Sequence, residues 1–293
     1  TAYEISRGLV GSEMCIRDSI LKSLYMGSVF RDLLKLCLNE RSWVPFHYLL
    51  TIQALSRPAH AYCMWYAADL ALRLGIKEIS AIEFGVAGGN TLRILERYAK
   101  RIKKTTGISI HLIGFDTGEG LPTPEGEADL PYWFALGQYP MDESKLREVL
   151  HGSDVVIGNV NQTMESYLFS KHIPPIGAMF FDVDLFSSTR DCLTIFKQPA
   201  EQFLPRVFTY IDDVVGSNLE LYGEFNGALM ALDEFNKINT RIKIHMNRNL
   251  LPQYFNRWRY NIYYAHLFDH PLYTRYIGGK EKEHEQRFLR LDL

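Results

Sequence analysis

The sequence predicts an α/β fold: a doubly wound, mostly parallel sheet with antiparallel strands at its C-terminal end and helices before it. The first observation is that short apolar runs of strand length alternate with segments whose apolar residues recur at helical spacing. The second is that these segments follow one another in βαβ order, which is typical of a parallel sheet with helices on both faces. A length of 293 residues suits one large core, or a core with a small appendage, and we expect one main domain.

The composition is that of a soluble globular protein and gives no reason to expect nucleic acid or membrane as a partner. Hydrophobic residues make up 47%, charged residues 23%, and the formal net charge is -2. No apolar run reaches the roughly 18 residues of a membrane span, and no signal peptide pattern is visible. The four cysteines are widely spaced, as expected of free thiols in a reducing compartment. We therefore expect a cytoplasmic protein.

The N-terminal part divides into a tail and a helical region. Residues 1–19 have no helical or strand period, and GLVGSEMCIRDS within them resembles a translated sequencing adapter, so we interpret them as a non-native or disordered tail. Residues 20–74 follow a helical pattern that Pro45 interrupts, and Pro58 suits the first turn of a second helix. One apolar stripe comprises Leu33, Leu34, Cys37 and Leu38. We expect these helices to pack against the edge of the sheet or to cover the ligand cleft.

The stretch AIEFGVAGGNT, residues 81–91, is predicted to join a strand to a helix. The apolar run 79–84 forms the strand, and helical spacing begins at Leu92. Between them lie Gly85, Gly88 and Gly89. Glycines let the backbone bend sharply and let a ligand approach the unpaired N–H groups at the start of a helix. Such turns also occur for packing alone, so this turn is weak support when taken by itself.

The rest of the chain is predicted to continue the alternation. Further parallel strands are expected at 110–115, 155–157, 176–181 and 207–211. A helix is expected at 188–203, with Ser187 or Ser188 as its N-cap, and another at 227–237. Residues 241–246 and 261–268 are expected to form an antiparallel pair at one edge of the sheet.

Acidic or amide residues follow the predicted strands at their carboxyl ends. They are Asp116, Asn159, Asp182 with Asp184, and Asp212 with Asp213. In an open parallel sheet, ligands bind outside the carboxyl ends of the strands. We therefore expect these side chains to converge on one cleft together with the glycine turn.

The paired aspartates indicate a site for a hard divalent cation such as Mg²⁺. Asp182 and Asp184 are two residues apart, so both point to one face while the chain stays extended. With Asp212 or Asp213 they place three carboxylates around one point, where they raise one another's pKa unless a cation neutralises them. The alternative is structural: Asp212 and Asp213 form a turn, and Asp184 caps the helix that follows.

Four motifs, in this order, resemble the class I S-adenosylmethionine-dependent methyltransferases. They are EFGVAGGNT, GFDTGEGLP, FDVDLFSST and YIDDVVG. More narrowly, they resemble the macrocin O-methyltransferase-like family, which methylates sugar hydroxyls with the help of a divalent metal. The resemblance covers about residues 57–237 and implies a Rossmann-like S-adenosylmethionine-binding domain. We place that domain at 75–270, with 20–74 packing on it and 271–293 as a C-terminal tail.

The resemblance also implies roles for single residues. The residues that match the motif holding the methionine part of the cofactor are Glu83, Gly85, Gly88 and Gly89. Asp116 matches the acid that binds the ribose hydroxyls, and the metal-binding carboxylates are matched by Asp182, Asp212 and Asp213. Gly118 stands where the family has an aromatic residue, and VIGNVNQT follows the family's third-strand segment only loosely. The adenine pocket is therefore less well defined by the motifs than the metal site.

The activity predicted on these grounds is metal-assisted O-methylation of a sugar or a glycosylated metabolite, a small-molecule or glycan acceptor. Methyl transfer from a sulfonium is an in-line displacement, so the enzyme aligns the hydroxyl and removes its proton. A cation on the three aspartates would lower the pKa of the hydroxyl. Asp184, or the ligand Asp182, would accept the proton. A homo-oligomer is compatible with the sequence.

Three rival interpretations remain. A nicotinamide-dependent oxidoreductase uses a glycine turn and an acid after the second strand, but it needs no carboxylates at two further strand ends. A metal-dependent glycosyltransferase explains the pair Asp182 and Asp184, but it leaves the Gly85 turn and the pair at 212–213 unexplained. A non-enzymatic interaction protein that has kept the fold is supported only by the altered segment VIGNVNQT.

Overall fold

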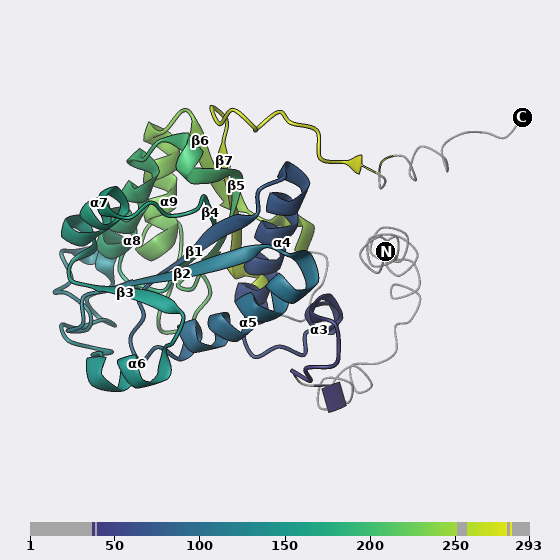
Figure 1. Cartoon of the computed structure of the whole chain (residues 1–293). Coiled ribbons are helices and arrows are strands. Elements are labelled where there is room, and N and C mark those ends of the chain that lie inside the picture. The colour runs from purple at the N-terminus through teal and green to yellow at the C-terminus, as the bar shows by residue number, and fades with distance from the viewer. Residues whose placement is uncertain (1–36, 39, 251–256, 280–281, 283–293) are drawn as a thin grey trace, which may run out of the picture.

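The computed structural model describes residues 37–38, 40–250, 257–279 and 282. The predicted tail at 1–19 lies outside these residues, and so do Leu33 and Leu34 of the apolar stripe. Figure 1 shows a central twisted sheet with helices on both of its faces. No helix in the described part is long and apolar enough to span a membrane. Of the cysteines described, Cys37 is exposed, whereas Cys63 and Cys192 are buried, and all three are free thiols.

The sheet that the structure describes has seven strands in the order β3-β2-β1-β4-β5-β7-β6. Strands β1 to β5 pair in parallel, and β7 is antiparallel to both of its neighbours, β5 and β6. The bounds are β1 Glu78–Phe84, β2 Ser109–Asp116, β3 Ser153–Ile157, β4 Ile176–Phe181, β5 Phe203–Ile211, β6 Ile242–Met246 and β7 Ile262–Leu267. The predicted doubly wound, mostly parallel sheet with an antiparallel C-terminal pair is confirmed.

Helices cover both faces of this sheet (Figure 1). Their bounds are α3 Phe46–Ile52, α4 Pro58–Leu74, α5 Asn90–Thr106, α6 Glu143–Val149, α7 Val160–Ser170, α8 Phe186–Leu193 and α9 Gly227–Ile238. The short 3₁₀ turns are η1 Glu127–Asp129, η2 Thr194–Lys197, η3 Ala200–Gln202, η4 Arg248–Leu250 and η5 Arg257–Asn261. Helices α3, α4 and α5 pack in one hydrophobic layer, and α7, α8 and α9 pack in the other.

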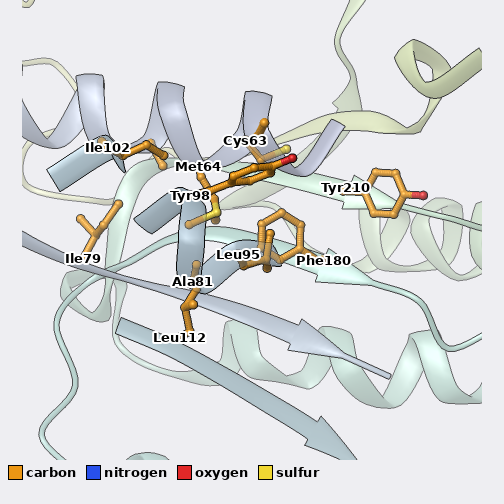
Figure 2. Close-up of a cluster of buried hydrophobic side chains, with 14 of the residues drawn as sticks. Cys63, Met64, Ile79, Ala81, Leu95, Tyr98, Ile102, Leu112, Phe180 and Tyr210 are labelled. Carbon is orange, nitrogen blue, oxygen red and sulfur yellow. The ribbon is translucent and has the colours of Figure 1, made fainter. Parts of the chain in front are cut away.

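Strand β4 shows how one sheet supports two cores. All six of its residues are buried, and its side chains alternate between the faces. Phe180 packs in the layer of α4 and α5, where Figure 2 shows it with Met64 and Tyr98, whereas Phe181 packs in the layer of α8 and α9. Full burial of such a side chain stabilises the fold by about 1.5 to 3 kcal/mol. The near-continuous apolar run of β4 is therefore a consequence of burial on both faces.

Helix α4 begins with Pro58 in its first turn, as predicted, but it does not pack at the sheet edge. It contacts β1, β4 and β5 in the middle of one face. The reason is its composition: ten of its 17 residues are buried, so the helix needs cover on more than one side and receives it from the sheet and α5.

The helix predicted at 188–203 is much shorter in the structure. Helix α8 ends at Leu193, two 3₁₀ turns follow, and Phe203 already belongs to β5. Pro199 lies between the two 3₁₀ turns, and a proline has no N–H to continue a helix. The predicted N-cap is also wrong, because Leu185 occupies that position. The N–H and hydroxyl of Ser187 instead donate to the Asp129 carboxylate at 2.7 and 2.8 Å.

Candidate active site

A cleft of about 510 Å³ opens at the carboxyl ends of the parallel strands. Among the predicted site residues, those that line it are Glu83, Gly85, Gly88, Asp116, Asp182, Asp184 and Asp212. Among the described residues that line the cleft, Gly89 and Asp213 are absent. The strand-end residues thus converge because the parallel strands end at one edge, as the sequence predicted.

Glycine occupies the three positions of the turn for different physical reasons. Gly85 has φ +83°, and a Cβ there would lie 1.7 Å from the carbonyl oxygen of Asp182. Gly89 has φ +71°, and its Cβ would lie 2.0 Å from Leu146. Gly88 has no such constraint, since the nearest heavy atom to its Cβ, on Asn90, would be 4.0 Å away. The clash with a backbone atom therefore requires glycine at 85, and the left-handed conformation favours glycine at 89. At 88, glycine leaves open space beside the cleft.

Asp116 fastens the glycine turn to the loop after β2. Its Oδ2 accepts hydrogen bonds from the N–H groups of Val86 and Ala87, at 2.7 and 2.8 Å. Its Oδ1 accepts one from the N–H of Gly118, at 2.7 Å. A carboxylate oxygen can accept two hydrogen bonds, so Oδ1 retains capacity for a ligand hydroxyl. This structural task of Asp116 adds to the ribose contact that the motif resemblance implied.

Glu83 is a buried carboxyl group at the floor of the cleft. Its side chain is 1% exposed, and its Oε2 has no hydrogen-bond partner among the residues described. Burial first, and then the negative charge of Asp182, raise the pKa of Glu83 well above its usual range. Arg57 and a hydrogen bond from Thr91 act in the opposite direction. Such a group favours a cationic partner in the cleft.

Four aspartates form a cluster, named the carboxylate cluster here: Asp182, Asp184, Asp212 and Asp213. Burial is the first cause that raises the pKa of Asp182, and the charges of Asp212 and Asp213 follow. Burial also raises the pKa of Asp184 to about 7, with Asp182 and Asp212 adding to the effect. The pKa of Asp213 is raised by burial and then by the negative charge of Asp184. The mutual repulsion expected from the sequence is therefore present.

Neighbouring groups hold the cluster in place. The hydroxyl of Tyr210 donates a hydrogen bond to Oδ1 of Asp212, and that of Tyr222 donates to Oδ1 of Asp213 at 3.1 Å. The side-chain amide of Asn261 donates to the backbone carbonyls of Ile211 and Asp212, at 2.7 and 2.6 Å. The sequence motifs did not identify Tyr210 or Asn261 as support for this site.

Asp184 lies beyond the end of β4, in a left-handed conformation with φ +59°. Strand alternation therefore no longer determines its direction relative to Asp182. Its backbone N–H donates to Oδ2 of Asp213 at 3.0 Å, which joins the two strand ends. Leu185, and not Asp184, occupies the N-cap position of α8, so the alternative role of Asp184 as a helix cap is wrong.

The described residues contain no group of three or more His, Cys, Asp or Glu side chains arranged to hold a metal ion. The carboxylate cluster supplies oxygen donors and negative charge of the kind that Mg²⁺ prefers. Its chemistry fits a divalent cation, whereas its side chains are not placed in a finished coordination sphere.

Arg57 and Tyr139 line the cleft without any signal in the sequence. Arg57 directly precedes α4, and its positive charge lowers the pKa values of Glu83 and Asp182. Tyr139 belongs to the long loop between β2 and α6. Both come from segments without a motif, and only the fold brings them to the strand ends.

No family model matches the chain, and neither does any curated protein. Among solved structures, the crystal structure of CalS11, a calicheamicin methyltransferase, matches with a TM-score of 0.51 at 18% sequence identity, covering 76% of this chain and 90% of that one. The chain has the class I methyltransferase fold. The Rossmann-like domain that the four motifs implied is thus confirmed at the level of the fold.

Two further structures are similar to this class I methyltransferase fold. One is the apo structure of CalS11, described as a TDP-rhamnose 3'-O-methyltransferase, with a TM-score of 0.44, 17% identity and coverage of 82% of this chain and 94% of that one. The other is an O-methyltransferase from Bacillus cereus in complex with SAH, with a TM-score of 0.39, 13% identity and coverage of 83% and 98%.

Proposed function

We propose that this protein is an S-adenosylmethionine-dependent O-methyltransferase. The observation that carries the proposal is that one cleft joins the glycine turn and Asp116 to the carboxylate cluster, at the strand ends of a class I methyltransferase fold. Its volume of about 510 Å³ suits a small-molecule cofactor with part of an acceptor.

The cofactor would lie along the glycine turn. Glu83 offers an unsatisfied buried oxygen, which suits the ammonium group of the methionine part, and Arg57 offers a cation for its carboxylate. Gly88 leaves room for the cofactor to approach the backbone. Asp116 has a free acceptor position for a ribose hydroxyl. These assignments extend the roles that the motif resemblance implied for Glu83, Gly85, Gly88, Gly89 and Asp116.

A divalent cation such as Mg²⁺ would be held by Asp182, Asp212 and Asp213. The support is electrostatic: burial, and then the charges of Asp212 and Asp213, raise the pKa of Asp182. Burial, and then the charges of Asp184 and Asp212, raise the pKa of Asp213. When bound, the ion supplies positive charge that stabilises a deprotonated acceptor hydroxyl. Asp184 or Asp182 accepts the proton of that hydroxyl, and the walls of the cleft keep the oxygen in line with the methyl group.

The acceptor in this proposal is a hydroxyl of a sugar or of a glycosylated metabolite. Support comes from the four ordered motifs and from the position of the carboxylate cluster beside the glycine turn. A nicotinamide-dependent oxidoreductase would not need that cluster. A metal-dependent glycosyltransferase would not need the constrained Gly85 turn.

The test is calorimetric titration of the full chain with S-adenosylmethionine, repeated with excess Mg²⁺ and with a chelator. We expect micromolar binding that survives the chelator, because the cofactor and cation are held by different residues. Absence of binding under both conditions would overturn the proposal. Titrations with nucleotide sugars and nicotinamide cofactors would then test the two rival enzyme classes.

A further inference from the structure

Two consecutive N–H groups in front of helix α4 find their hydrogen-bond acceptors on side chains that are distant in the sequence. The N–H of Ser56 donates to Oε1 of Glu40 at 2.9 Å. The N–H of Arg57 donates to the hydroxyl of Tyr98, on α5, at 3.2 Å. Arg57 occupies the N-cap position of α4, and its own side chain forms no capping hydrogen bond. The chain that leads into α4 is therefore held by remote groups rather than by a local cap.

Glu40 and Tyr98 are also joined to each other, and with Ser56 they form a unit that we name the latch. The hydroxyl of Tyr98 donates to Oε1 of Glu40 at 3.2 Å, and the hydroxyl of Ser56 donates to the same oxygen. Burial raises the pKa of Glu40, but the hydrogen bonds from Ser56 and the charge of Arg97 outweigh it, so this pKa is lowered. Burial, with the charge of Glu40 adding to it, raises the pKa of Tyr98 to about 12. At neutral pH the acceptor thus stays ionised and the donor keeps its proton.

Helix α5 holds the latch against the hydrophobic core. Arg97 forms an ion pair with Oε2 of Glu40 at 3.0 Å. The ring of Tyr98 is 1% exposed and packs edge-on against Phe46, with ring centroids 5.3 Å apart. Figure 2 shows this ring among the buried side chains of the cluster. Because the ring is part of a close-packed core, the position of its hydroxyl is fixed.

The backbone of Arg57 is restrained on both sides of its Cα atom. Its N–H is held by Tyr98, and its carbonyl accepts a hydrogen bond from the N–H of Ala61 at 2.9 Å. Pro58 follows, and a residue before proline is restricted to extended conformations. The side chain of Arg57 lines the cleft, where its positive charge lowers the pKa of Glu83. The restrained backbone therefore determines where the guanidinium group enters the cleft.

We infer that Tyr98 is a positioning residue for the cofactor: through the backbone of Arg57 it sets the guanidinium group that binds the carboxylate of the methionine part. Glu40 acts with it by orienting the Tyr98 hydroxyl. Neither Glu40 nor Tyr98 is among the described residues that line the cleft, so both act through Arg57. A guanidinium group binds a carboxylate best in one defined geometry, which is why a small displacement of its backbone weakens the contact. The inference rests on the proposed function and adds a remote determinant of cofactor binding to it.

The test compares two ligands on the full chain by calorimetric titration. S-adenosylhomocysteine carries the amino-acid group, whereas 5'-methylthioadenosine keeps the adenine, ribose and thioether and lacks that group. We expect the wild type to bind S-adenosylhomocysteine at least about tenfold more tightly. Tyr98→Phe, which keeps the ring and removes the hydroxyl, should weaken S-adenosylhomocysteine binding about fivefold and change 5'-methylthioadenosine binding by less than about twofold. Equal weakening of both ligands, or no change in either, would overturn the inference.

A double-mutant cycle tests whether Tyr98 acts through Arg57. Arg57→Gln alone should weaken S-adenosylhomocysteine binding about tenfold and leave 5'-methylthioadenosine binding nearly unchanged. Adding Tyr98→Phe to Arg57→Gln should then cost no more than about a further twofold, because the group that Tyr98 positions is already absent. A full additional fivefold loss would show that Tyr98 acts independently of Arg57 and would overturn the inference.

Two further variants separate positioning from general loosening of the fold. Glu40→Ala removes the acceptor of the Tyr98 hydroxyl and should produce the same selective loss, which keeps the inference testable even where Tyr98→Phe does not fold. Tyr167→Phe is the matched control, because it also removes a hydroxyl that donates to a carboxylate, that of Asp154 at 2.6 Å. Tyr167 lies on α7 and is not among the described residues that line the cleft. The control should bind both ligands as the wild type does, and a selective loss as large as that of Tyr98→Phe would overturn the inference.

The wild-type titrations separate this inference from the proposed function. Tight binding of S-adenosylhomocysteine with unchanged selectivity in Tyr98→Phe and Glu40→Ala would leave the methyltransferase function standing and overturn the role of the latch. Equal wild-type affinities for the two ligands would keep a nucleoside site and overturn the roles of Arg57 and the latch. Absence of binding of either ligand to the wild type would overturn the proposed function and the inference with it.

Discussion

Asp116 and Asp212 occupy the same cleft, but their contacts indicate separate tasks. Asp116 holds the N–H groups of Val86 and Ala87 in the glycine turn, whereas Asp212 belongs to the carboxylate cluster. Asp116→Ala should weaken S-adenosylmethionine binding at least tenfold, with or without Mg²⁺. Asp212→Ala should leave cofactor affinity within about twofold and abolish metal-dependent methyl transfer. Calorimetry and a turnover assay measure both, and equal loss of cofactor binding in the two variants would contradict this division.

Gly85 and Gly88 give a second matched pair at the same scale. Gly85→Ala would place a Cβ 1.7 Å from a carbonyl oxygen at φ +83°, so the free energy of unfolding should fall by more than about 2 kcal/mol. Gly88→Ala meets open space and should leave that free energy nearly unchanged. If the cofactor approaches the backbone at Gly88, this variant should nevertheless bind it at least tenfold more weakly. Urea unfolding and calorimetry test both expectations, and full cofactor affinity in Gly88→Ala would refute the proposed approach.

His60 predicts a specific loss of stability in acid. It is buried on α4 against Phe180 and Tyr210, with ring centroids 4.8 and 4.2 Å away, and its Nε2 has no partner in the described structure. Burial, followed by the charge of Arg57, lowers its pKa to about 3. The unfolded chain, with a histidine pKa of about 6.5, therefore binds one more proton between these values. The stabilisation is complete above pH 6.5 and is lost as the pH falls toward 3.

The measurement is urea unfolding of the wild type and His60→Phe at pH 7.5 and pH 5.5. Because of this residue, the free energy of unfolding of the wild type should fall by about 1.4 kcal/mol between pH 7.5 and pH 5.5. At pH 5.5 the protonated form of His60 outnumbers the neutral form about ten to one in the unfolded chain, whereas the folded chain keeps it neutral. The variant lacks the titrating group and should lose that much less. Parallel pH profiles for the two proteins would contradict this prediction, because they would show that His60 has the same pKa in the folded and the unfolded chain.

The residues of the site divide into those that the sequence could predict and those that it could not. The predictable residues lie in or directly after apolar runs: Glu83, Gly85, Asp116 and Asp182. Because ligands bind at the carboxyl ends of parallel strands, the position of each residue at a strand end was sufficient to predict that they meet in one cleft. Other residues reach the site from places that no strand-end rule covers. They are Arg57 before α4, Tyr139 in a loop, Tyr210 at a buried position of β5, and Asn261 just before β7. Their roles depend on tertiary distances, which no local pattern in the chain encodes.

At the scale of elements, Asp129 connects the loop 117–142 with the start of α8. It is 1% exposed and accepts hydrogen bonds from the N–H of Glu125 and from the N–H and hydroxyl of Ser187. It thus replaces the capping residue that the sequence placed at Ser187 or Ser188. This substitution of a distant carboxylate for a local cap explains why the start of the helix was not predictable from its own residues.

Asp129→Ala should consequently destabilise the protein. We expect the free energy of unfolding to fall by about 1 to 3 kcal/mol, because the N–H groups of two buried or partly buried segments lose their acceptor. Cofactor affinity should stay within about twofold. Asp142→Ala is the matched control, since Asp142 caps the exposed helix α6. Denaturant unfolding of both variants checks the expectation, which equal stability losses would contradict.

Element types were more predictable than element lengths. The apolar runs identified β1 to β5 and the antiparallel pair β6 and β7 because burial dictates hydrophobic pattern directly. The helix expected at 188–203 is longer than α8 because the 3₁₀ turns that follow α8 have a similar apolar pattern, whereas Pro199 prevents one continuous helix. The central place of α4 on the sheet face depends on which other helices share that face, and spacing alone does not determine it.

At the scale of the whole molecule, the two hydrophobic layers and the cleft depend on one another. The layers of α3 to α5 and of α7 to α9 bury both faces of β1 and β4, so the polar residues of the central strands gather at the strand ends. Four carboxyl groups in one place are costly when charged, and the well-packed core must compensate for that cost. A ligand that neutralises the cluster should therefore stabilise the entire fold and not only its own loops.

The last prediction measures that linkage. Mg²⁺ should raise the melting temperature of the full chain in scanning calorimetry, and a chelator should reverse the rise, since an ion that binds only the folded state adds its binding free energy to stability. S-adenosylmethionine at about 100 times its dissociation constant should add about 2.7 kcal/mol, independently of the chelator. Sodium chloride at matched ionic strength controls for general screening. In Asp212→Ala the cofactor shift should persist and the Mg²⁺ shift should vanish. A Mg²⁺ shift of full size in that variant would place the cation elsewhere on the molecule and remove Asp182, Asp212 and Asp213 as its ligands.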